Sequence, residues 1–202
     1  MIQPMRRLTL VRHGETEGQS SIRYHGRTDV PLNALGRAQM ERTRAALRDE
    51  TFSGVYASTL SRSVQAATIV GRTTAVTQVP GFDEIDFGDW EGLTQEEIRA
   101  GHPEAYARWA ANGTDFHYPG GESTRAFRER VVHALHNVLA TAPAANLLFV
   151  VHKGIIRCVL GELLRLDDVR RGSWLIALGS IHVIDQADGV WRPEALDRTD
   201  HL

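Results

Sequence analysis

The stretch 146–152, NLLFVVH, decides the fold class of this sequence. It is an almost unbroken apolar run that ends in a histidine, His152. A run of this length without polar alternation is typical of a strand buried on both faces of a parallel sheet. A second strand-forming run, RLTLV at 7–11, is rich in leucine and β-branched residues and is followed by Arg12 and His13. The sequence therefore predicts two buried strands that each lead directly into a histidine.

Strand-like runs alternate with helix-forming stretches along the rest of the chain. This alternation predicts an α/β fold, a three-layer α/β/α sandwich with a mostly parallel central sheet. No repeat or linker interrupts it, so we expect residues 1–202 to form a single domain. We expect helices at 35–50, 59–72, 122–142 and 155–166, one or two short helices within 94–111, and strands at 7–11, 54–58, 74–80, 146–152, 173–180, 181–186 and 190–196.

Composition excludes several classes of function. Charged residues make up 24% of the chain and the net charge is −2, so neither nucleic acid nor a membrane surface is expected as a partner. No signal peptide and no apolar run of the ~20 residues that span a bilayer is found, which makes a cytoplasmic location the expectation. The single cysteine, Cys158, cannot form an internal disulfide and is expected to be buried.

The two strand-end histidines are the first candidates for chemistry. In α/β sheets, sites form where parallel strands end, and both His13 and His152 are closely followed by a glycine. An imidazole there could bind a metal, act as acid or base, or act as a nucleophile. Arg12 beside His13 would repel a cation, and a guanidinium matches phosphate in charge and geometry. The pattern favours an anion site.

Five blocks of sequence, in order, resemble the histidine phosphatase superfamily. They are LVRHGETEGQS…GRTDVPLNALGRAQ, VYASTLSRSVQAA, FDEIDFGDWEGLT, PGGES and VVHKGIIR, and they cover roughly residues 7–165. The resemblance implies a phosphoglycerate mutase-like sandwich. The EIDFGDWEG and PGGES blocks look most like the small phosphatases of the superfamily, among them the α-ribazole and broad-specificity phosphatases.

The resemblance also implies a role for each central residue. His13 matches the nucleophile that becomes phosphohistidine, and Glu84 matches the proton donor. Arg12, Arg62 and His152 match the groups that hold the phosphoryl oxygens. These roles are physically sensible, because phosphoryl transfer depends mainly on positioning and charge stabilisation. Since the arginines supply positive charge, we expect neither a metal nor another cofactor.

Further residues of the same blocks are predicted to bind phosphate. They are Gly14, Thr16, Gln19 and Gly26. Gln19 stands where the family usually has asparagine, so its contact with phosphate is an open question. Lys153 departs from the usual pattern too, because glycine commonly follows the second histidine.

Hydrolysis is favoured over the alternatives. In the expected lid, around 87–120, the stretch of chain between Gly92 and Gly120 is short. Sugar-acid mutases of the family carry a longer insertion there. We expect a metal-independent phosphomonoesterase that acts on small phosphorylated metabolites. The alternatives are a phosphoglycerate mutase-type phosphotransferase and a non-catalytic module that binds a phosphate ligand.

Substrate choice is expected to lie in the lid and its surroundings. The candidates are Arg23, Arg27, Phe87, Trp90, Tyr106, Trp109 and Phe116. Their aromatic rings could stack on a sugar or base, although large aromatic residues more often pack in a core. The histidines without a partner pattern are expected at the surface; they are His25, His102, His117, His182 and His201. Apolar C-terminal strands could support a homodimer.

Overall fold

The structure is a computed structural model that describes residues 6–142, 146–166 and 175–202. In these residues six strands form one sheet in the order β3-β2-β4-β1-β5-β6. The pairs β1–β4, β2–β4 and β2–β3 are parallel, and β1–β5 and β5–β6 are antiparallel. The predicted mostly parallel sheet is confirmed. The strands are β1 (Arg6–Arg12), β2 (Gly54–Ala57), β3 (Val76–Gln78), β4 (Asn146–Val151), β5 (Ile181–Ala187) and β6 (Val190–Arg198).

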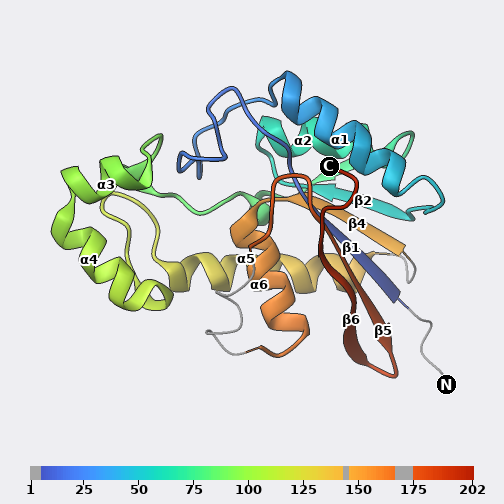
Figure 1. Cartoon of the computed structure of the whole chain (residues 1–202). Helices are drawn as coiled ribbons and strands as arrows, with labels where there is room; N and C mark the ends of the chain where they lie inside the picture. The colour runs from blue at the N-terminus through green and yellow to red at the C-terminus, as the bar shows by residue number, and fades with distance from the viewer. Residues whose placement is uncertain (1–5, 143–145, 167–174) are drawn as a thin grey trace.

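Helices cover both faces of the sheet, and this gives the three predicted layers (Figure 1). Alternate side chains of β4 show why, because Leu147 and Phe149 belong to one buried cluster and Leu148 and Val150 to the other. Each face of the strand is therefore buried by its own layer of helices. One cover is α1 (Ala34–Ala46) with α2 (Ser61–Gly71), and the other is α5 (Thr124–Thr141) with α6 (Lys153–Leu163).

Strand β4 lies at the centre of the sheet and explains the apolar run of the sequence. It pairs with β1 on one side and β2 on the other, so that Phe149 lies opposite both Leu10 and Tyr56. The pairing continues past the end of β1, where the His13 N–H donates to the carbonyl of Val151 at 3.0 Å. This parallel register brings the two strand-end histidines side by side.

The segment expected to form a lid projects beyond the carboxyl edge of the sheet (Figure 1). It contains two short helices, as one of the two sequence alternatives predicts, and Pro103 begins the second of them. Thr94 and Glu97 form a capping box at the first helix. The segment follows η1 (Pro80–Phe82), and its elements are η2 (Gly88–Trp90), α3 (Gln95–Gly101), α4 (Pro103–Asn112) and η3 (Gly113–Asp115).

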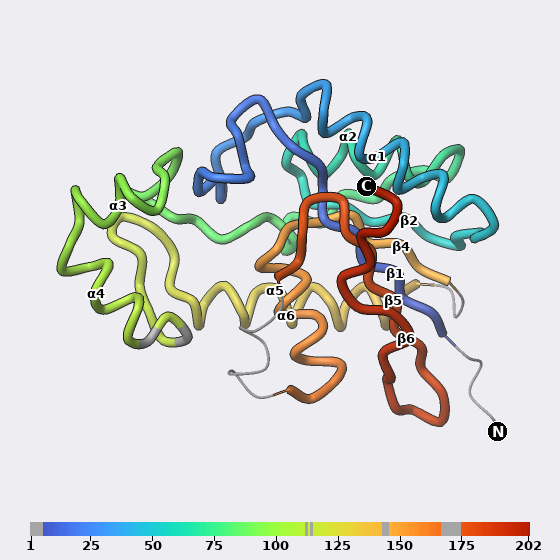
Figure 2. Tube along the Cα trace, viewed as in Figure 1, coloured from blue at the N-terminus to red at the C-terminus, as the bar shows by residue number. Residues whose placement is uncertain are grey.

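The strand predicted at 173–180 is wrong for the residues that the structure describes. Residues 175–180 run as an irregular arch into β5 (Figure 2), and residues 173–174 lie outside the described chain. A turn interrupts the apolar pattern, because Gly179 has a φ of +79° and the Ser180 N–H donates to Ala177. The Gly179 N–H donates to the carbonyl of Arg12 instead of to a sheet partner. The arch thus packs against the end of β1.

Two further expectations about burial are corrected. Cys158 is half-buried, not buried. His182 was expected at the surface but is 1% exposed. Its position on β5 opposite Leu10 places it inside the sheet, where its Nδ1 accepts the Asp197 N–H at 3.1 Å.

His182 predicts a specific loss of stability in acid. Burial lowers its pKa to about 4, so the folded state holds the neutral imidazole and the unfolded state takes up the proton near pH 6.5. Stability from this residue is therefore complete above about pH 6.5 and falls as the pH drops towards 4. We expect the free energy of unfolding to fall by about 2 kcal/mol more in the wild type than in His182→Asn between pH 7 and pH 5. Urea unfolding of both proteins at the two pH values measures this, and equal losses would contradict it.

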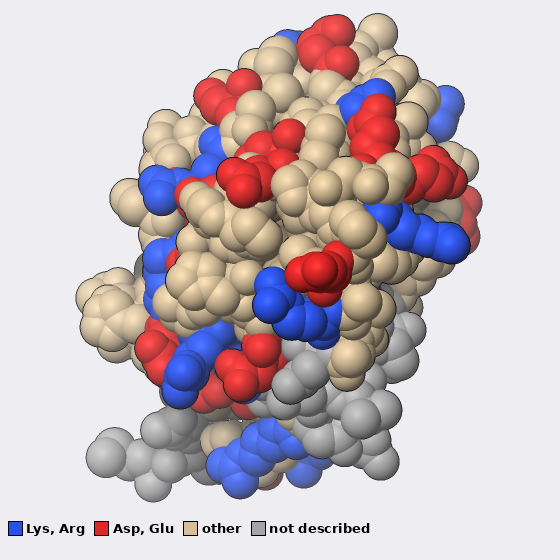
Figure 3. Space-filling view, turned by 90° about the vertical axis from the view of Figure 1, so that its left-hand side faces the viewer, with Lys and Arg blue, Asp and Glu red and all other residues tan. Residues whose placement is uncertain are grey.

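On the side of the molecule where α3 and α4 lie, the surface of the described residues shows no single dominant charge (Figure 3). On this face lysine and arginine side chains lie interspersed with aspartate and glutamate (Figure 3). Among the described helices, none is both long and apolar enough to cross a membrane.

Candidate active site

His13 lies where β1 ends and is almost completely buried, with 4% of its surface exposed. Its Nδ1 is 2.8 Å from the carbonyl oxygen of Gly14. A carbonyl can only accept, so Nδ1 carries the proton and Nε2 keeps its lone pair. Burial lowers the pKa of His13 well below its usual value, and the nearby Arg62 and Arg12 cations lower it further. His13 is therefore a neutral imidazole that carries its lone pair on Nε2.

His152 faces His13 from the end of β4, with the two ring centroids 5.1 Å apart. Its Nδ1 accepts the Arg62 Nε–H at 3.3 Å, so its Nε2 carries the proton and points to the Ser58 hydroxyl at 2.7 Å. Burial and the Arg62 cation hold the pKa of His152 well below its usual value. Ser58 was missed by the sequence interpretation, although its place directly after β2 was a usable signal.

Arg62 comes from the first turn of α2 and is fully buried. Its Nη1 donates to the carbonyl of Thr28 at 2.8 Å, and Nη2 donates to those of His25 and Gly26 at 3.1 and 2.6 Å. With the Nε bond to His152, four of its five N–H donors are engaged by the protein. Arg62 thus presents its charge and one Nη1 hydrogen from a rigid position.

Arg12 is the second cation of the cluster. Its Nη1 donates to the carbonyl of Ile176 in the arch at 2.8 Å. Burial lowers the pKa of Arg12 to about 10, while the Glu84 carboxylate acts in the opposite direction. Within the described residues, its buried Nε has no hydrogen-bond partner. The guanidinium stays charged at neutral pH and keeps a donor free for an anion.

Glu84 follows η1 and is 7% exposed. Its Oε1 accepts the N–H of Ile85 at 3.0 Å and its Oε2 accepts the N–H of Gly154 at 2.9 Å. A side chain at position 154 would not fit, because an added Cβ would lie 2.3 Å from Oε1. The glycine two residues after His152 therefore gives the carboxyl group its place beside the histidine.

Arg130 of α5 holds the backbone that leads into Glu84. Its Nη1 donates to the carbonyls of Gly81 and Asp83 at 3.1 and 2.9 Å. Its Nε and Nη2 pair with the carboxylate of Glu122, from the PGGES block, at 3.1 and 2.8 Å. Arg130 was missed by the sequence interpretation, because a helical arginine carries no local sign of such contacts.

Lys153 occupies the first position of α6, directly after His152. Burial lowers its pKa to about 8, and the Arg157 and Arg12 cations act in the same direction. The departure from the usual glycine therefore adds a half-buried amine near the cluster.

The four further residues predicted to bind phosphate, Gly14, Thr16, Gln19 and Gly26, occupy different surroundings. Gly14 supplies the carbonyl that orients His13, and Gly26 has both its N–H and its C=O engaged, by Glu91 and Arg62. Thr16 is buried, with its hydroxyl 2.8 Å from that of Ser20. Gln19 is exposed with a left-handed φ of +59°. The structure thus leaves Gln19 at the surface and not buried with His13.

The aromatic residues of the lid largely pack on one another. Trp90 is fully buried, and its ring contacts those of Tyr24, Trp109, Phe116 and Tyr118 at centroid distances of 5.3 to 6.4 Å. For Trp90 the packing interpretation is therefore the one the structure supports. The cluster anchors the lid to the loop that carries Tyr24.

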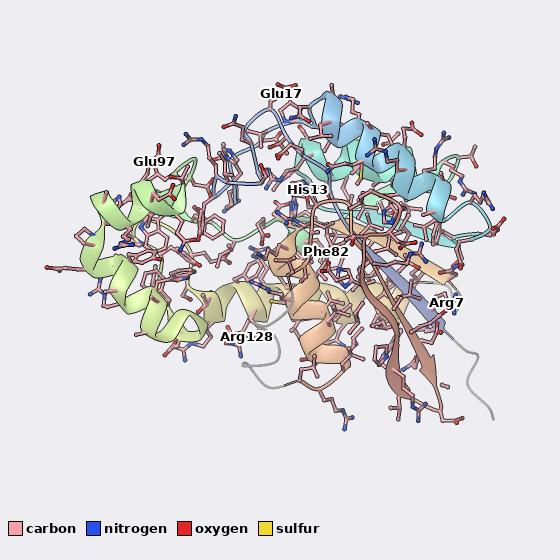
Figure 4. The ribbon with its side chains drawn as sticks, viewed as in Figure 1. Arg7, His13, Glu17, Phe82, Glu97 and Arg128 are labelled. Carbon is pink, nitrogen blue, oxygen red and sulfur yellow. The ribbon has the colours of Figure 1, made fainter. Side chains whose placement is uncertain are left out.

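The site as a whole combines a neutral imidazole with fixed positive charge. His13 lies at the sheet edge near the start of α6, between the sheet and the lid helices (Figure 4). The ring of His152 faces it, Arg12 and Arg62 lie close enough to lower its pKa, and Glu84 interacts with both arginines. Across the described residues, no group of three or more His, Cys, Asp or Glu side chains is arranged to hold a metal ion. The arrangement can bind a tetrahedral anion and attack it.

Comparisons with known proteins identify the family of the chain. A family model described as the histidine phosphatase superfamily (branch 1) matches residues 8–199. An adenosylcobalamin/α-ribazole phosphatase of Salmonella typhimurium is 31% identical over 93% of this chain and 100% of its own length. A metal-independent phosphoserine phosphatase of Arabidopsis thaliana is 28% identical over 96% of this chain and 82% of its own.

A solved structure agrees as well. The crystal structure of the α-ribazole phosphatase from Shigella flexneri superimposes with a TM-score of 0.85 at 26% identity, covering 95% of this chain and 96% of that one. The family model and the fold therefore indicate the same family. The chain belongs to the histidine phosphatase superfamily, branch 1.

Proposed function

We propose that this protein is a phosphomonoesterase that acts without a metal, through a phosphohistidine at His13. The observation that carries the proposal is the state of His13, a buried and neutral imidazole whose Nδ1 is held by the carbonyl of Gly14, which leaves the lone pair on Nε2. Two arginines beside it supply the positive charge that a phosphate dianion needs.

The reaction has two steps. His13 Nε2 attacks phosphorus in line; the Nε2–P bond forms and the bond from phosphorus to the ester oxygen breaks, while Glu84 gives its proton to that oxygen. In the second step Glu84 takes a proton from water, which attacks phosphorus and releases inorganic phosphate and free His13. Arg12, Arg62 and His152 stabilise the equatorial oxygens in both steps.

A phosphoenzyme experiment tests this mechanism. We expect the wild type, treated with a ³²P-labelled phosphate monoester in EDTA and quenched in alkali, to carry label that is stable to base and lost in acid, as a phosphoramidate is. His13→Ala is expected to carry none. Label that persists in His13→Ala, or turnover that disappears with EDTA, would contradict the mechanism. A binding module without catalysis would give no label in either protein.

The substrate is proposed only as a class, small phosphorylated metabolites. Relatives are named for different activities, such as adenosylcobalamin/α-ribazole phosphatase and phosphoserine phosphatase. The short segment between Gly92 and Gly120 favours hydrolysis over mutase activity. Incubation with 3-phosphoglycerate and 2,3-bisphosphoglycerate separates the two, because a mutase would form 2-phosphoglycerate faster than free phosphate.

A further inference from the structure

The loop 25–28 is held on one side by Arg62. All three carbonyl contacts of the Arg62 Nη atoms go to this loop, at His25, Gly26 and Thr28. Because these bonds account for most of the guanidinium donors, the position of the loop sets the position and tilt of the Arg62 plane.

The same loop is held on its other side by Glu91, from the base of the lid. The Glu91 carboxylate accepts the N–H groups of Gly26, Arg27 and Thr28 at 3.0 to 3.2 Å. It also accepts the N–H of Phe87 at 3.1 Å. Backbone N–H groups that converge on one carboxylate make strong, charge-assisted hydrogen bonds. Glu91 therefore binds the loop through its amides while Arg62 binds it through its carbonyls.

Packing leaves the loop little room to move. A Cβ on Gly26 would lie 1.8 Å from the carbonyl oxygen of Ile85, next to Glu84 in the chain. The Glu91 carboxylate also acts directly on Arg62, since it is among the groups that oppose the effect of burial on the pKa of that arginine. The loop is thus a peptide bridge between a buried cation and a carboxylate.

We infer that Glu91 is a positioning residue for the phosphate site. It fixes loop 25–28, and through the loop it fixes the Arg62 guanidinium against the phosphoryl group. It also ties the base of the lid, which begins at η2, to the arginine that binds the anion. This inference rests on the proposed function, because it assigns Arg62 to the phosphate.

The test compares Glu91→Gln with a matched control, Glu96→Gln, whose carboxylate is exposed on the same lid. Glutamine keeps the shape of Glu91 but turns an N–H donor towards the loop amides. We expect kcat/KM for p-nitrophenyl phosphate to fall about 10- to 100-fold and the Kd for inorganic phosphate, measured by calorimetry, to rise by a similar factor. Glu96→Gln is expected to match the wild type in both.

A double-mutant cycle separates positioning from general destabilisation. If Glu91 acts through Arg62, the Glu91→Gln change is expected to have little further effect on phosphate affinity in an Arg62→Lys background. Additive losses would overturn the inference. So would a Glu91→Gln protein with wild-type phosphate affinity and wild-type kcat/KM.

Two readouts keep this result distinct from a failure of the proposed function. Phosphate affinity does not depend on turnover, and hydrogen exchange reports the loop directly. We expect the amides of Gly26, Arg27 and Thr28 to exchange faster in Glu91→Gln, while amides of β4 keep their protection. Unchanged exchange at the loop would overturn the inference. An inactive wild type that still binds phosphate would overturn the proposed hydrolysis alone.

Discussion

Replacing His13 with alanine is expected to lower kcat/KM for p-nitrophenyl phosphate by about 10⁴-fold or more. The reason is that no other side chain can take its place at the phosphorus atom. The facing imidazole, His152, has both ring nitrogens engaged, by Arg62 and Ser58. Phosphate binding should survive, because Arg12 and Arg62 remain in place.

The assay is steady-state turnover with EDTA present throughout. His133→Ala is the matched control, since His133 is exposed on α5 outside the site. We expect it to retain wild-type activity. Substantial turnover by His13→Ala, with phosphate affinity like that of the wild type, would show that another group attacks phosphorus.

Replacing Glu84 with glutamine is expected to have the second largest effect, and the effect should depend on the leaving group. For phosphoserine, whose alkoxide needs a proton as it departs, we expect kcat to fall by about 10²- to 10⁴-fold. For p-nitrophenyl phosphate we expect a much smaller loss in the first step, because p-nitrophenolate departs without a proton. The Glu84 carboxyl is well placed for this role, since Ile85 and Gly154 hold both of its oxygens.

Parallel assays of the two substrates decide the point. Asp89→Asn serves as the control, because Asp89 lies in the same acidic block but is exposed. An equal loss of kcat/KM on both substrates would indicate that Glu84 positions phosphate instead of donating a proton, because kcat/KM reports the first step and not the hydrolysis of the phosphoenzyme. If Asp89→Asn loses more activity than Glu84→Gln, then Glu84 is not the carboxylate of this block that donates the proton.

Much of the fold could be predicted because it depends on local patterns. The apolar run of β4 has to be buried on both faces, so it predicts helices above and below the sheet. The Pro103 break predicts the division of the lid into α3 and α4. The arch at 175–180 could not be predicted this way, since its apolar residues look like a strand. Its turn at Gly179 and its bonds to the end of β1 are long-range features.

The candidate site, like the fold, could be predicted from the sequence only in part. The sequence by itself determined that His13 and His152 follow buried strands beside an arginine and a glycine, which is local information. Only the tertiary structure decided that β1 and β4 are neighbours, so that the rings lie 5.1 Å apart.

The supporting contacts also belong to the tertiary structure. The Ser58 hydroxyl bonds to a residue that is 94 positions away along the chain. Arg130 donates to carbonyls 47 and 49 positions away, and Glu91 accepts from N–H groups 63 to 65 positions away. Burial of His182 depends in the same way on the pairing of β5 with β1. The physical reason is that a sequence pattern reports which face of an element is buried, whereas hydrogen-bond partners depend on which elements meet in space.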